Sequence, residues 1–346
     1  MGPRRRKKSR ERYFYQSQTI TLRLGSQSTF IQMSFKRIFF LSSLIAVILY
    51  ACGGNSGKKT TDTVNNPAQE SLTFGDVNGI RFYEVKRRFS NGLSFNKDGF
   101  MLVPTWIIEH KAPDTMLAYS PEKRGMEAFY LQFDHGRVYN FAREFFRVKM
   151  ITKDSLVLQR LQVDARVITK GEVSDVNCTF YTKDYIEKVL KTTIGELQRP
   201  TKADTAYIKK LSAATYRNPS NPDTAFAATE PVEFKPNSKN VKVEKLAYVD
   251  SAKAKTSYAY MYPEYRLEIN KSYKEFRLRF SMVVDVKGNM YVNRVEGVLP
   301  EDIPARKKLI QGILDVYVKN LFYIKPGTTM GIPHSSEVTI NLVGNK

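Results

Sequence analysis

The 346-residue chain has two cysteines, and one of them, Cys52, lies where a covalent modification is expected. It directly follows Ala51 and an uncharged apolar run, residues 38–50, which the basic pair Lys36 and Arg37 precedes. A basic cluster, an apolar segment and a small residue before the cleavage point are typical of a secretory signal. The 13-residue run is too short, at about 1.5 Å per residue, to span the roughly 30 Å hydrocarbon core of a bilayer. The pattern favours a cleaved signal over a membrane span.

The four residues Leu49-Tyr50-Ala51-Cys52 resemble a bacterial lipobox. This resemblance implies that residues 33–51 are a lipoprotein signal peptide and that Cys52 becomes the lipidated first residue of the mature protein. An uncleaved signal anchor is the alternative. We therefore expect a cell-envelope protein held to the membrane by its lipid anchor, on the periplasmic face of the outer membrane rather than at the inner membrane.

Residues 1–32 are predicted to be an over-long start, because Met33 begins a normal signal peptide. They hold eight Lys or Arg and one Glu, and Lys36 and Arg37 add two charges, so that +12 of the formal +21 remains from Cys52 onward. The remaining Lys and Arg are scattered along the predicted strands next to Asp and Glu. This pattern indicates a solvated surface, and we expect no nucleic-acid partner.

No arrangement of residues predicts catalysis, a metal site or a cofactor. His110, His135 and His334 are isolated in loop-like sequence and lack the spacing of metal ligands. The second cysteine, Cys178, lies in an alternating strand-like segment, which predicts a buried structural residue. Trp106 is likewise expected to belong to the core. We therefore expect a protein that is not an enzyme.

Composition divides the rest of the chain into segments. Residues 52–73 are polar and without periodicity, which predicts a tether. Residues 74–197 contain short aromatic and β-branched runs separated by turn residues, which predict a β-rich domain folded as a small barrel or sandwich. One hairpin is expected around the turn 152–155, and the part from Leu131 to Leu158 resembles a lipocalin-type barrel. Residues 198–257, rich in Pro, Asn and Lys, are predicted to be an interdomain linker.

Several Asp-Ser/Thr triplets in or beside this linker, such as Asp204-Thr205-Ala206 and Asp223-Thr224-Ala225, resemble O-glycosylation acceptors of exported proteins in Bacteroidetes-type bacteria. Ordinary turn chemistry explains such dipeptides equally well.

The last quarter of the chain has a definite order of predicted elements. A strand over 275–284, a Gly-containing turn over 285–289 and a return strand over 290–295 form a hairpin. A helix over 304–322 and a final strand over 336–343 follow. The expected class is α+β, with the helix covering one face of a small antiparallel sheet.

Residues 280–343 resemble the C-terminal domain of TonB and TonB-like envelope proteins. The shared elements are the hairpin, the helix before an aromatic-x-x-Pro-Gly segment, a later Gly-x-Pro segment and the closing strand, with Tyr-Pro at the entry: Asp285–Asn289, Tyr323–Gly327, Met330–Pro333 and Tyr262-Pro263. The resemblance implies a domain over 258–346 that binds an extended peptide, such as one from an outer-membrane receptor, by β-augmentation. It assigns the binding edge to the last strand: Glu337, Val338, Thr339, Ile340, Asn341 and Leu342.

Two classes of function remain open. The first is an envelope protein that binds a protein partner through its C-terminal domain; a TonB-type energy transducer with an uncleaved anchor is a variant of this class. The second is a ligand-binding lipoprotein with a lipocalin-like barrel in residues 74–190. A filled barrel core would favour the first class, and an apolar interior with few convergent polar groups would favour the second.

Overall fold

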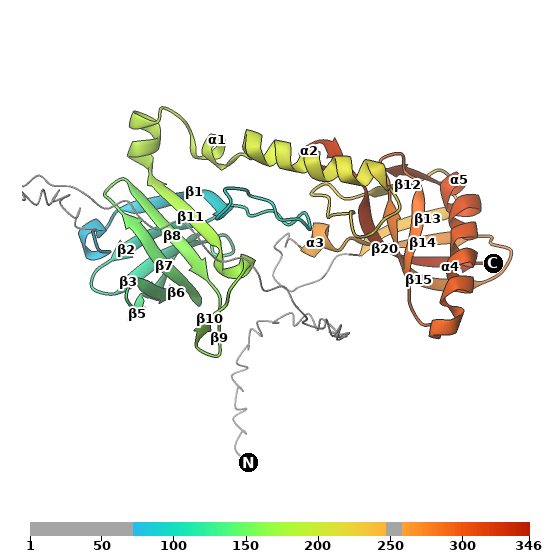
Figure 1. Ribbon diagram of the computed structural model, residues 1–346, viewed down its shortest axis with the longest axis horizontal. Coiled ribbons are helices and arrows are strands. Elements are labelled where there is room, and N and C mark those ends of the chain that lie inside the picture. Colours follow the sequence, from blue (N-terminus) through green and yellow to red (C-terminus); the bar gives the residue numbers. More distant parts are fainter. Residues whose placement is uncertain (1–71, 247–257) are drawn as a thin grey trace, which may run out of the picture. The chain divides into compact units, whose positions relative to one another are not determined.

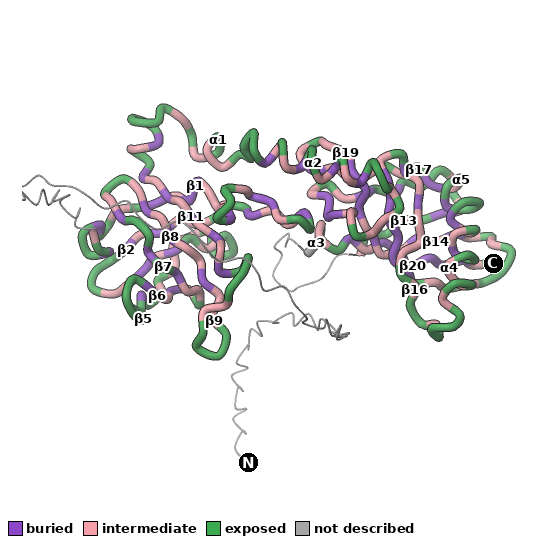
Figure 2. The backbone as a smooth tube through the Cα atoms, in the orientation of Figure 1, coloured by how far each residue is buried: buried purple, intermediate pink, exposed green. Residues whose placement is uncertain are grey.

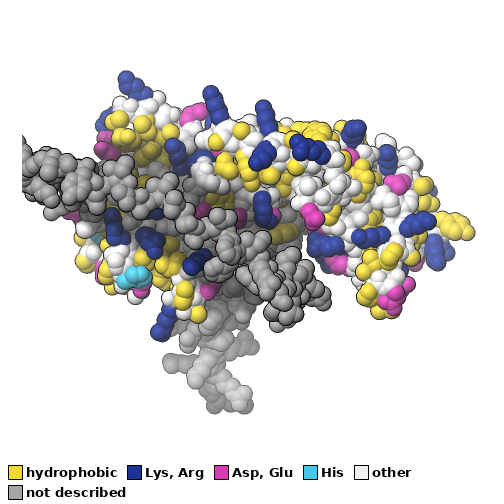
Figure 3. Space-filling model, in the orientation of Figure 1, with side chains coloured by type: hydrophobic (Ala, Val, Ile, Leu, Met, Phe, Trp, Pro, Cys, Tyr) yellow, Lys and Arg dark blue, Asp and Glu magenta, His cyan; other side chains and the backbone are white. Residues whose placement is uncertain are grey.

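The computed structural model describes residues 72–246 and 258–346, which are mostly β-strand (Figure 1). The predictions for residues 1–32, for the signal peptide 33–51, for Cys52 and for nearly all of the tether 52–73 concern residues outside the described ranges. Within those ranges, no helix has the length and apolar character needed to cross a bilayer. On the face shown in Figure 3, Lys and Arg side chains are dispersed among acidic and hydrophobic ones.

The first part of the described chain forms one antiparallel sheet of nine strands in the order β4-β3-β2-β1-β11-β8-β7-β6-β5. The bounds are β1 (Arg81–Phe89), β2 (Ile107–Lys111), β3 (Thr115–Ser120), β4 (Gly125–Tyr130), β5 (Gln132–His135), β6 (Val138–Phe141), β7 (Glu144–Ile151), β8 (Ser155–Leu161) and β11 (Val176–Thr182). A small hairpin, β9 (Val163–Asp164) with β10 (Val167–Ile168), and the 3-10 turns η1 (Gly75–Val77) and η2 (Glu172–Ser174) complete this part.

This sheet is a nearly closed barrel. Consecutive strands pair from β1 to β4 and from β5 to β8, and β11 lies between β8 and β1 and pairs with both. The two edge strands β4 and β5 are consecutive in the chain and are separated only by Leu131, whose amide donates to the carbonyl of Asp114. The prediction for residues 74–197 was a small β-barrel or sandwich, and the structure confirms the β-rich fold and shows the barrel-like alternative. The hairpin predicted at residues 152–155 is the β7–β8 connection.

Apolar side chains fill most of the barrel interior. Along β11, alternate residues from Val176 to Thr182 are buried, as expected for a strand with one face toward a core. Figure 2 shows buried segments on the other strands of the barrel as well. The core contains Phe82, Phe141 and Leu158, each at most 2 % exposed.

The linker predicted for residues 198–257 is wrong from Lys202 to Leu246. This segment contains α2 (Lys202–Arg217), β12 (Glu233–Pro236) and β13 (Val241–Leu246), and it follows the π-helical turn η3 (Tyr185–Val189) and α1 (Ile194–Gln198). Helix α2 begins with a capping box, in which Thr201 and Asp204 each accept from the other's backbone amide. Asp204 is fully buried and also pairs with Arg88 at 2.9 Å, so long-range contacts stabilise a segment of polar composition.

The C-terminal module is built on a five-stranded sheet in the order β13-β14-β20-β15-β16. Its later strands are β14 (Glu264–Asn270), β15 (Phe276–Val284), β16 (Met290–Val295) and β20 (Ser336–Asn345). The remaining elements are α3 (Tyr258–Met261), η4 (Pro300–Asp302), α4 (Ile303–Ile313), η5 (Leu314–Val318), α5 (Lys319–Leu321), β17 (Phe322–Lys325), β18 (Thr328–Thr329) and β19 (Ile332–Pro333).

The predicted hairpin, helix and final strand of this module are confirmed. The helix covers one face of the sheet, where Ile310, Leu314 and Val318 pack with Phe280 and Leu342 in a common core. The turn of the hairpin places Gly288 at φ +77°, which other residues rarely adopt. The sheet is mixed rather than antiparallel, because β14 runs parallel to β20, and the module begins before residue 258 because β13 belongs to it.

Candidate functional site: the C-terminal sheet edge and the barrel cavity

The predicted binding edge, the final strand β20, is not an edge. Residues Thr339 to Asn345 pair with β14 in parallel, and residues Ser336 to Gly344 pair with β15 in antiparallel. The prediction is therefore wrong for the ladder positions Thr339, Ile340, Asn341 and Leu342, whose backbone groups already serve two neighbouring strands. Sequence order did not reveal this because β14 is separated from β20 by the whole hairpin and helix.

The side chains of β20 divide between the two faces of the sheet. Val338, Ile340 and Leu342 are at most 1 % exposed and belong to the core beneath the helix. On the other face, Glu337 accepts from Asn293 and pairs with Arg294, each at 3.0 Å. Burial opposes ionisation of this carboxylate, but its hydrogen bonds, including those from Arg294 and Asn293, outweigh burial and lower the pKa of Glu337. Glu337 and Val338 are thus structural residues of this strand.

The true edges of this sheet are β16 and β13, and they differ. The side chain of Gln311 covers β16, because its Oε1 accepts from the Val292 amide at 3.1 Å and its Nε2 donates to the Met290 carbonyl at 2.8 Å. No such cover is present on β13 among the described residues. The Asn270 amide donates to the Asn240 carbonyl, which fixes the alternation of the ladder.

This alternation determines which backbone groups of β13 are available. Glu244 pairs with Arg266 four residues along the strand from the Asn240–Asn270 pair, which is an even number, so its amide and carbonyl also face β14. The amides and carbonyls of Val243 and Lys245 therefore face outward. Within the described ranges no hydrogen bond is recorded for them, so β13 is an open edge at these two residues.

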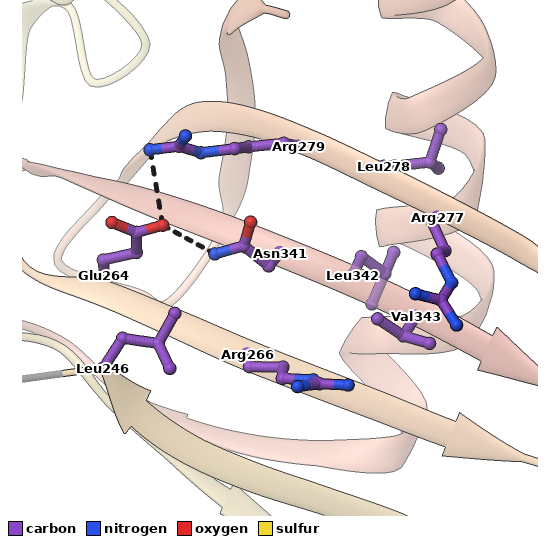
Figure 4. A pocket seen from close by; sticks show the side chains of 9 residues that line it. All are labelled: Leu246, Glu264, Arg266, Arg277, Leu278, Arg279, Asn341, Leu342 and Val343. Carbon is purple, nitrogen blue, oxygen red and sulfur yellow. Dashed lines mark hydrogen bonds and ion pairs between the residues drawn. The ribbon is translucent and has the colours of Figure 1, made fainter.

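A groove of about 460 Å³ lies on the sheet face beside this edge, lined by Leu246 of β13 and by residues of β14, β15 and β20 (Figure 4). Glu264 links the groove's polar groups, because its Oε1 accepts from Asn341 at 2.7 Å and lies 3.4 Å from Nη2 of Arg279. Figure 4 shows Arg277 in the same groove with no dashed contact to the other side chains drawn. Among the described residues Arg277 has no recorded ion pair, so it is an available cation.

A second candidate site is a cavity of about 200 Å³ in the barrel. Its lining comes from β1, β7, β8, β11 and the residue before β2: Arg87, Trp106, Glu144, Phe146, Arg160, Cys178 and Phe180. The Trp106 ring packs edge-on against Phe141 and Phe146, with centroids 5.6 and 5.5 Å apart. Trp106, predicted as a core residue, thus packs on the core and also lines the cavity.

Glu84 does not line the cavity but contacts its lining residue Arg87, and the Glu84 side chain is 0 % exposed. Its two oxygens accept from Nε and Nη2 of Arg87 at 2.7 and 2.6 Å, and Oε2 also accepts from the amides of Thr105 and Trp106 at 2.8 and 2.9 Å. Burial disfavours the charged guanidinium, but its bonds to Glu84 outweigh burial and raise the pKa of Arg87. Glu84 therefore holds both Arg87 and the backbone that carries Trp106.

A β-bulge places Glu84 and Arg87 on the same side of β1. In the pairing with β11, Glu84 lies opposite Phe180 but Lys86 lies opposite Thr179, so that Val85 is an extra residue. Strict alternation would direct residues 84 and 87 to opposite faces. The bulge instead aligns Arg87 with Cys178, toward the interior.

The second ion pair of the cavity joins neighbouring strands. Nε and Nη2 of Arg160 on β8 donate to the two oxygens of Glu144 on β7, at 2.6 and 2.7 Å. This bidentate arrangement orients the guanidinium plane. The pairs with Glu84 and Glu144 both use Nε and Nη2, so Nη1 of each guanidinium remains as a further donor.

The thiol of Cys178 lies between these groups. The prediction of a buried cysteine is confirmed, since the residue is 3 % exposed. Burial, and next the charge of Glu84, raise the pKa of the Cys178 thiol, which makes it a poor nucleophile at neutral pH. Among the residues that the structure describes, no group of three or more His, Cys, Asp or Glu is placed to hold a metal ion.

The histidines lie apart from both sites. His110 is in β2 and His135 is in β5, so the prediction of loop positions is wrong for these two, whereas His334 lies between β19 and β20. Asp134 and His135 are in contact, with Oδ2 and Nδ1 2.6 Å apart on the surface.

Comparison with known proteins adds no assignment to this geometry: no protein-family model matches the chain, and no curated protein matches it.

Proposed function

We propose that this chain is a cell-envelope lipoprotein whose C-terminal module binds an extended segment of another envelope protein along the edge of β13. The observation that supports this proposal is the difference between the two edges of the sheet. Gln311 covers one edge, and the other edge presents the outward backbone groups of Val243 and Lys245. An unpaired strand edge is a template for a further strand.

The resemblance of residues 280–343 to TonB-like C-terminal domains supports a partner from the envelope. In this proposal the added strand joins at β13, because the chain's own β14 occupies the position beside the final strand. The proposal keeps the β-augmentation expected from the resemblance but moves it from β20 to β13.

Charge favours an acidic segment as the occupant. β13 carries Lys242 and Lys245 against one acid, Glu244, and Arg277, which has no ion pair among the described residues, lies on β15 at the far side of the groove. A second copy of the same strand would bring these lysines together, which discourages self-pairing. We therefore expect the partner to carry Asp or Glu at alternate positions of the strand that it adds.

Proline substitution at two adjacent positions tests this edge. Lys245→Pro removes an outward amide from an exposed residue, so the ladder to β14 should remain and the melting temperature should stay close to that of the wild type. Glu244→Pro removes an amide that faces β14, and we expect it to destabilise the module. Acidic 12-residue peptides selected by display on the full chain should lose about tenfold or more in affinity, about 1.4 kcal/mol, for Lys245→Pro.

Hydrogen exchange supplies an independent check. The Val243 and Lys245 amides should exchange fast in the free chain and become protected by a selected peptide. If both amides are protected in the free chain, or if Lys245→Pro binds the peptides as tightly as the wild type, the open-edge proposal fails.

Lipidation at Cys52 is tested by the same kind of matched pair, because the chain has two cysteines. Labelled palmitate should enter the wild type and the Cys178→Ala variant, since that thiol is buried in the barrel. It should not enter Cys52→Ala, which lacks the acceptor thiol. Equal labelling of the Cys52→Ala protein would refute the lipoprotein assignment.

A further inference from the structure

We propose that the barrel cavity binds a small organic monocarboxylate with an aromatic or short aliphatic body. This inference is independent of the protein-binding function proposed for the C-terminal module. It rests on the guanidiniums of the largely buried Arg87 and the partly exposed Arg160, which both line the cavity, on the rings of Trp106, Phe146 and Phe180, and on the cavity volume.

The polar side of the cavity matches a carboxylate. Arg87 and Arg160 come from different strands, β1 and β8, and both line the same cavity. Each is fixed through Nε and Nη2 by a bidentate bond to its own glutamate, which leaves Nη1 as a donor with a set direction. Preorganised guanidinium donors bind carboxylates through short, charge-assisted hydrogen bonds.

The charge balance favours a singly charged ligand. Glu84 and Glu144 neutralise the two guanidiniums before any ligand enters. A monocarboxylate therefore adds one negative charge to a neutral cluster. A phosphate monoester would add about two, and desolvation of that charge is more costly.

The volume limits the ligand body. A buried apolar cavity of roughly 150 Å³ admits benzene, so a cavity of about 200 Å³ accommodates a ring with one small substituent. A long fatty acyl chain exceeds this volume. The rings of Trp106, Phe146 and Phe180 supply the apolar surface against which such a body packs.

The buried pair Glu84–Arg87 is not explained by stability alone. Replacement of a buried ion pair by apolar residues of similar volume is often neutral or stabilising. An interior that otherwise consists of Phe, Leu and Val side chains would pack without this pair. Its place at the wall of a cavity, beside the partly exposed pair Glu144–Arg160, fits recognition of a polar group.

Trp106 makes the site directly observable, because it is the only tryptophan of the chain. Titration of the full chain with benzoate or hexanoate should give a saturable change in Trp106 fluorescence. Benzamide, which has the same ring without the charge, should bind at least about tenfold more weakly. Saturating benzoate should also slow alkylation of Cys178 in a Cys52→Ala background, since this thiol lines the same cavity.

Two variants link the signal to the cavity. The double variant Arg160→Gln/Glu144→Gln removes one guanidinium without leaving an unpaired carboxylate, and it should lower benzoate affinity about tenfold. Arg147→Gln is the matched control, because Arg147 is an exposed residue of β7 whose contact is with Gln159, and it should bind as the wild type does. Cys178→Met fills the cavity, so it should abolish binding while the barrel stays folded, as judged by circular dichroism.

The proposal is overturned by any of three results. These are no saturable response to benzoate or hexanoate, equal affinity for benzoate and benzamide, or wild-type affinity in the folded Cys178→Met protein. None of them affects the test at Lys245, which reads peptide binding at a different part of the chain.

Discussion

Replacing Glu84 by Gln is expected to lower the free energy of unfolding by about 3–5 kcal/mol, the usual effect of removing one partner from a buried ion pair. The Glu84 side chain is completely buried and accepts four hydrogen bonds, two from Arg87 and one each from the amides of Thr105 and Trp106. In Gln, an NH₂ group replaces one of the accepting oxygens and would face the N–H groups of Arg87 and of the backbone. The charge of Arg87 would also be left uncompensated. Urea denaturation followed by Trp106 fluorescence measures the loss.

An exposed ion pair provides the control. Asp184 pairs with Lys188 at 2.7 Å, and both side chains are 73 % exposed, so Asp184→Asn should leave the free energy of unfolding close to the wild-type value. The double variant Glu84→Gln/Arg87→Met removes both charges and should be less destabilised than Glu84→Gln alone. A loss below about 1 kcal/mol for Glu84→Gln would show that the carboxylate is not the anchor that its contacts indicate.

Local pattern was sufficient to predict most strands and the helix of the C-terminal module. The turn at residues 285–289, with Gly288 at positive φ, and the three-to-four residue spacing of the helix are short-range signals. The edges of the sheet were not predictable in this way. The strand beside β20 is β14, a polar alternating segment whose inward residues Tyr265, Leu267 and Ile269 are recognisable as core only once the pairing is known.

A ligand-binding barrel was one of the predicted alternatives, but the charged lining of its cavity was not predicted, for a physical reason. A regular strand places Glu84 and Arg87 on opposite faces, and only the extra residue Val85 brings them together. Arg160 and Glu144 lie 16 residues apart and meet through the β7–β8 register. Neither of these two contacts can be recognised from a pattern in the sequence alone.

The sequence of the predicted linker contains a helix-start pattern that argues against a linker. Thr201-x-x-Asp204 before a run with apolar positions is a capping-box pattern, and it starts α2. Composition alone misled because the stabilising contacts of this helix are polar and long-range. Burial opposes ionisation of Asp204, but the Ser94 and Thr201 amides and then Arg88 outweigh it and lower its pKa.

His334 gives the chain a stability that depends on pH. The residue is 0 % exposed, and its ring stacks on Phe226 with centroids 3.6 Å apart. Nδ1 donates to the Ser335 carbonyl at 3.1 Å, which leaves Nε2 to accept from the Thr329 hydroxyl at 2.9 Å. These contacts suit the neutral imidazole, and burial lowers the pKa of His334 to about 4.

The sign of the effect follows from the two states. The unfolded chain binds a proton at His334 near its ordinary pKa of about 6.5, whereas the folded chain binds it only near 4. The folded chain therefore has the full stabilisation that comes from the neutral His334 above pH 6.5. This stabilisation is lost as the pH falls from 6.5 to 4. Linkage gives a decrease of about 2 kcal/mol between pH 7 and pH 5, reaching about 3 kcal/mol by pH 4.

Urea denaturation of wild type and His334→Gln at pH 7, 6 and 5 tests this assignment, because carboxylates contribute mainly below pH 5. The variant should be less stable at pH 7 and should lose much less stability on acidification. His110 is buried, and desolvation lowers its pKa, so it contributes in the same direction and accounts for the remaining slope. If wild type and His334→Gln lose equal free energy from pH 7 to pH 5, protonation of His334 is not what destabilises the folded chain in acid.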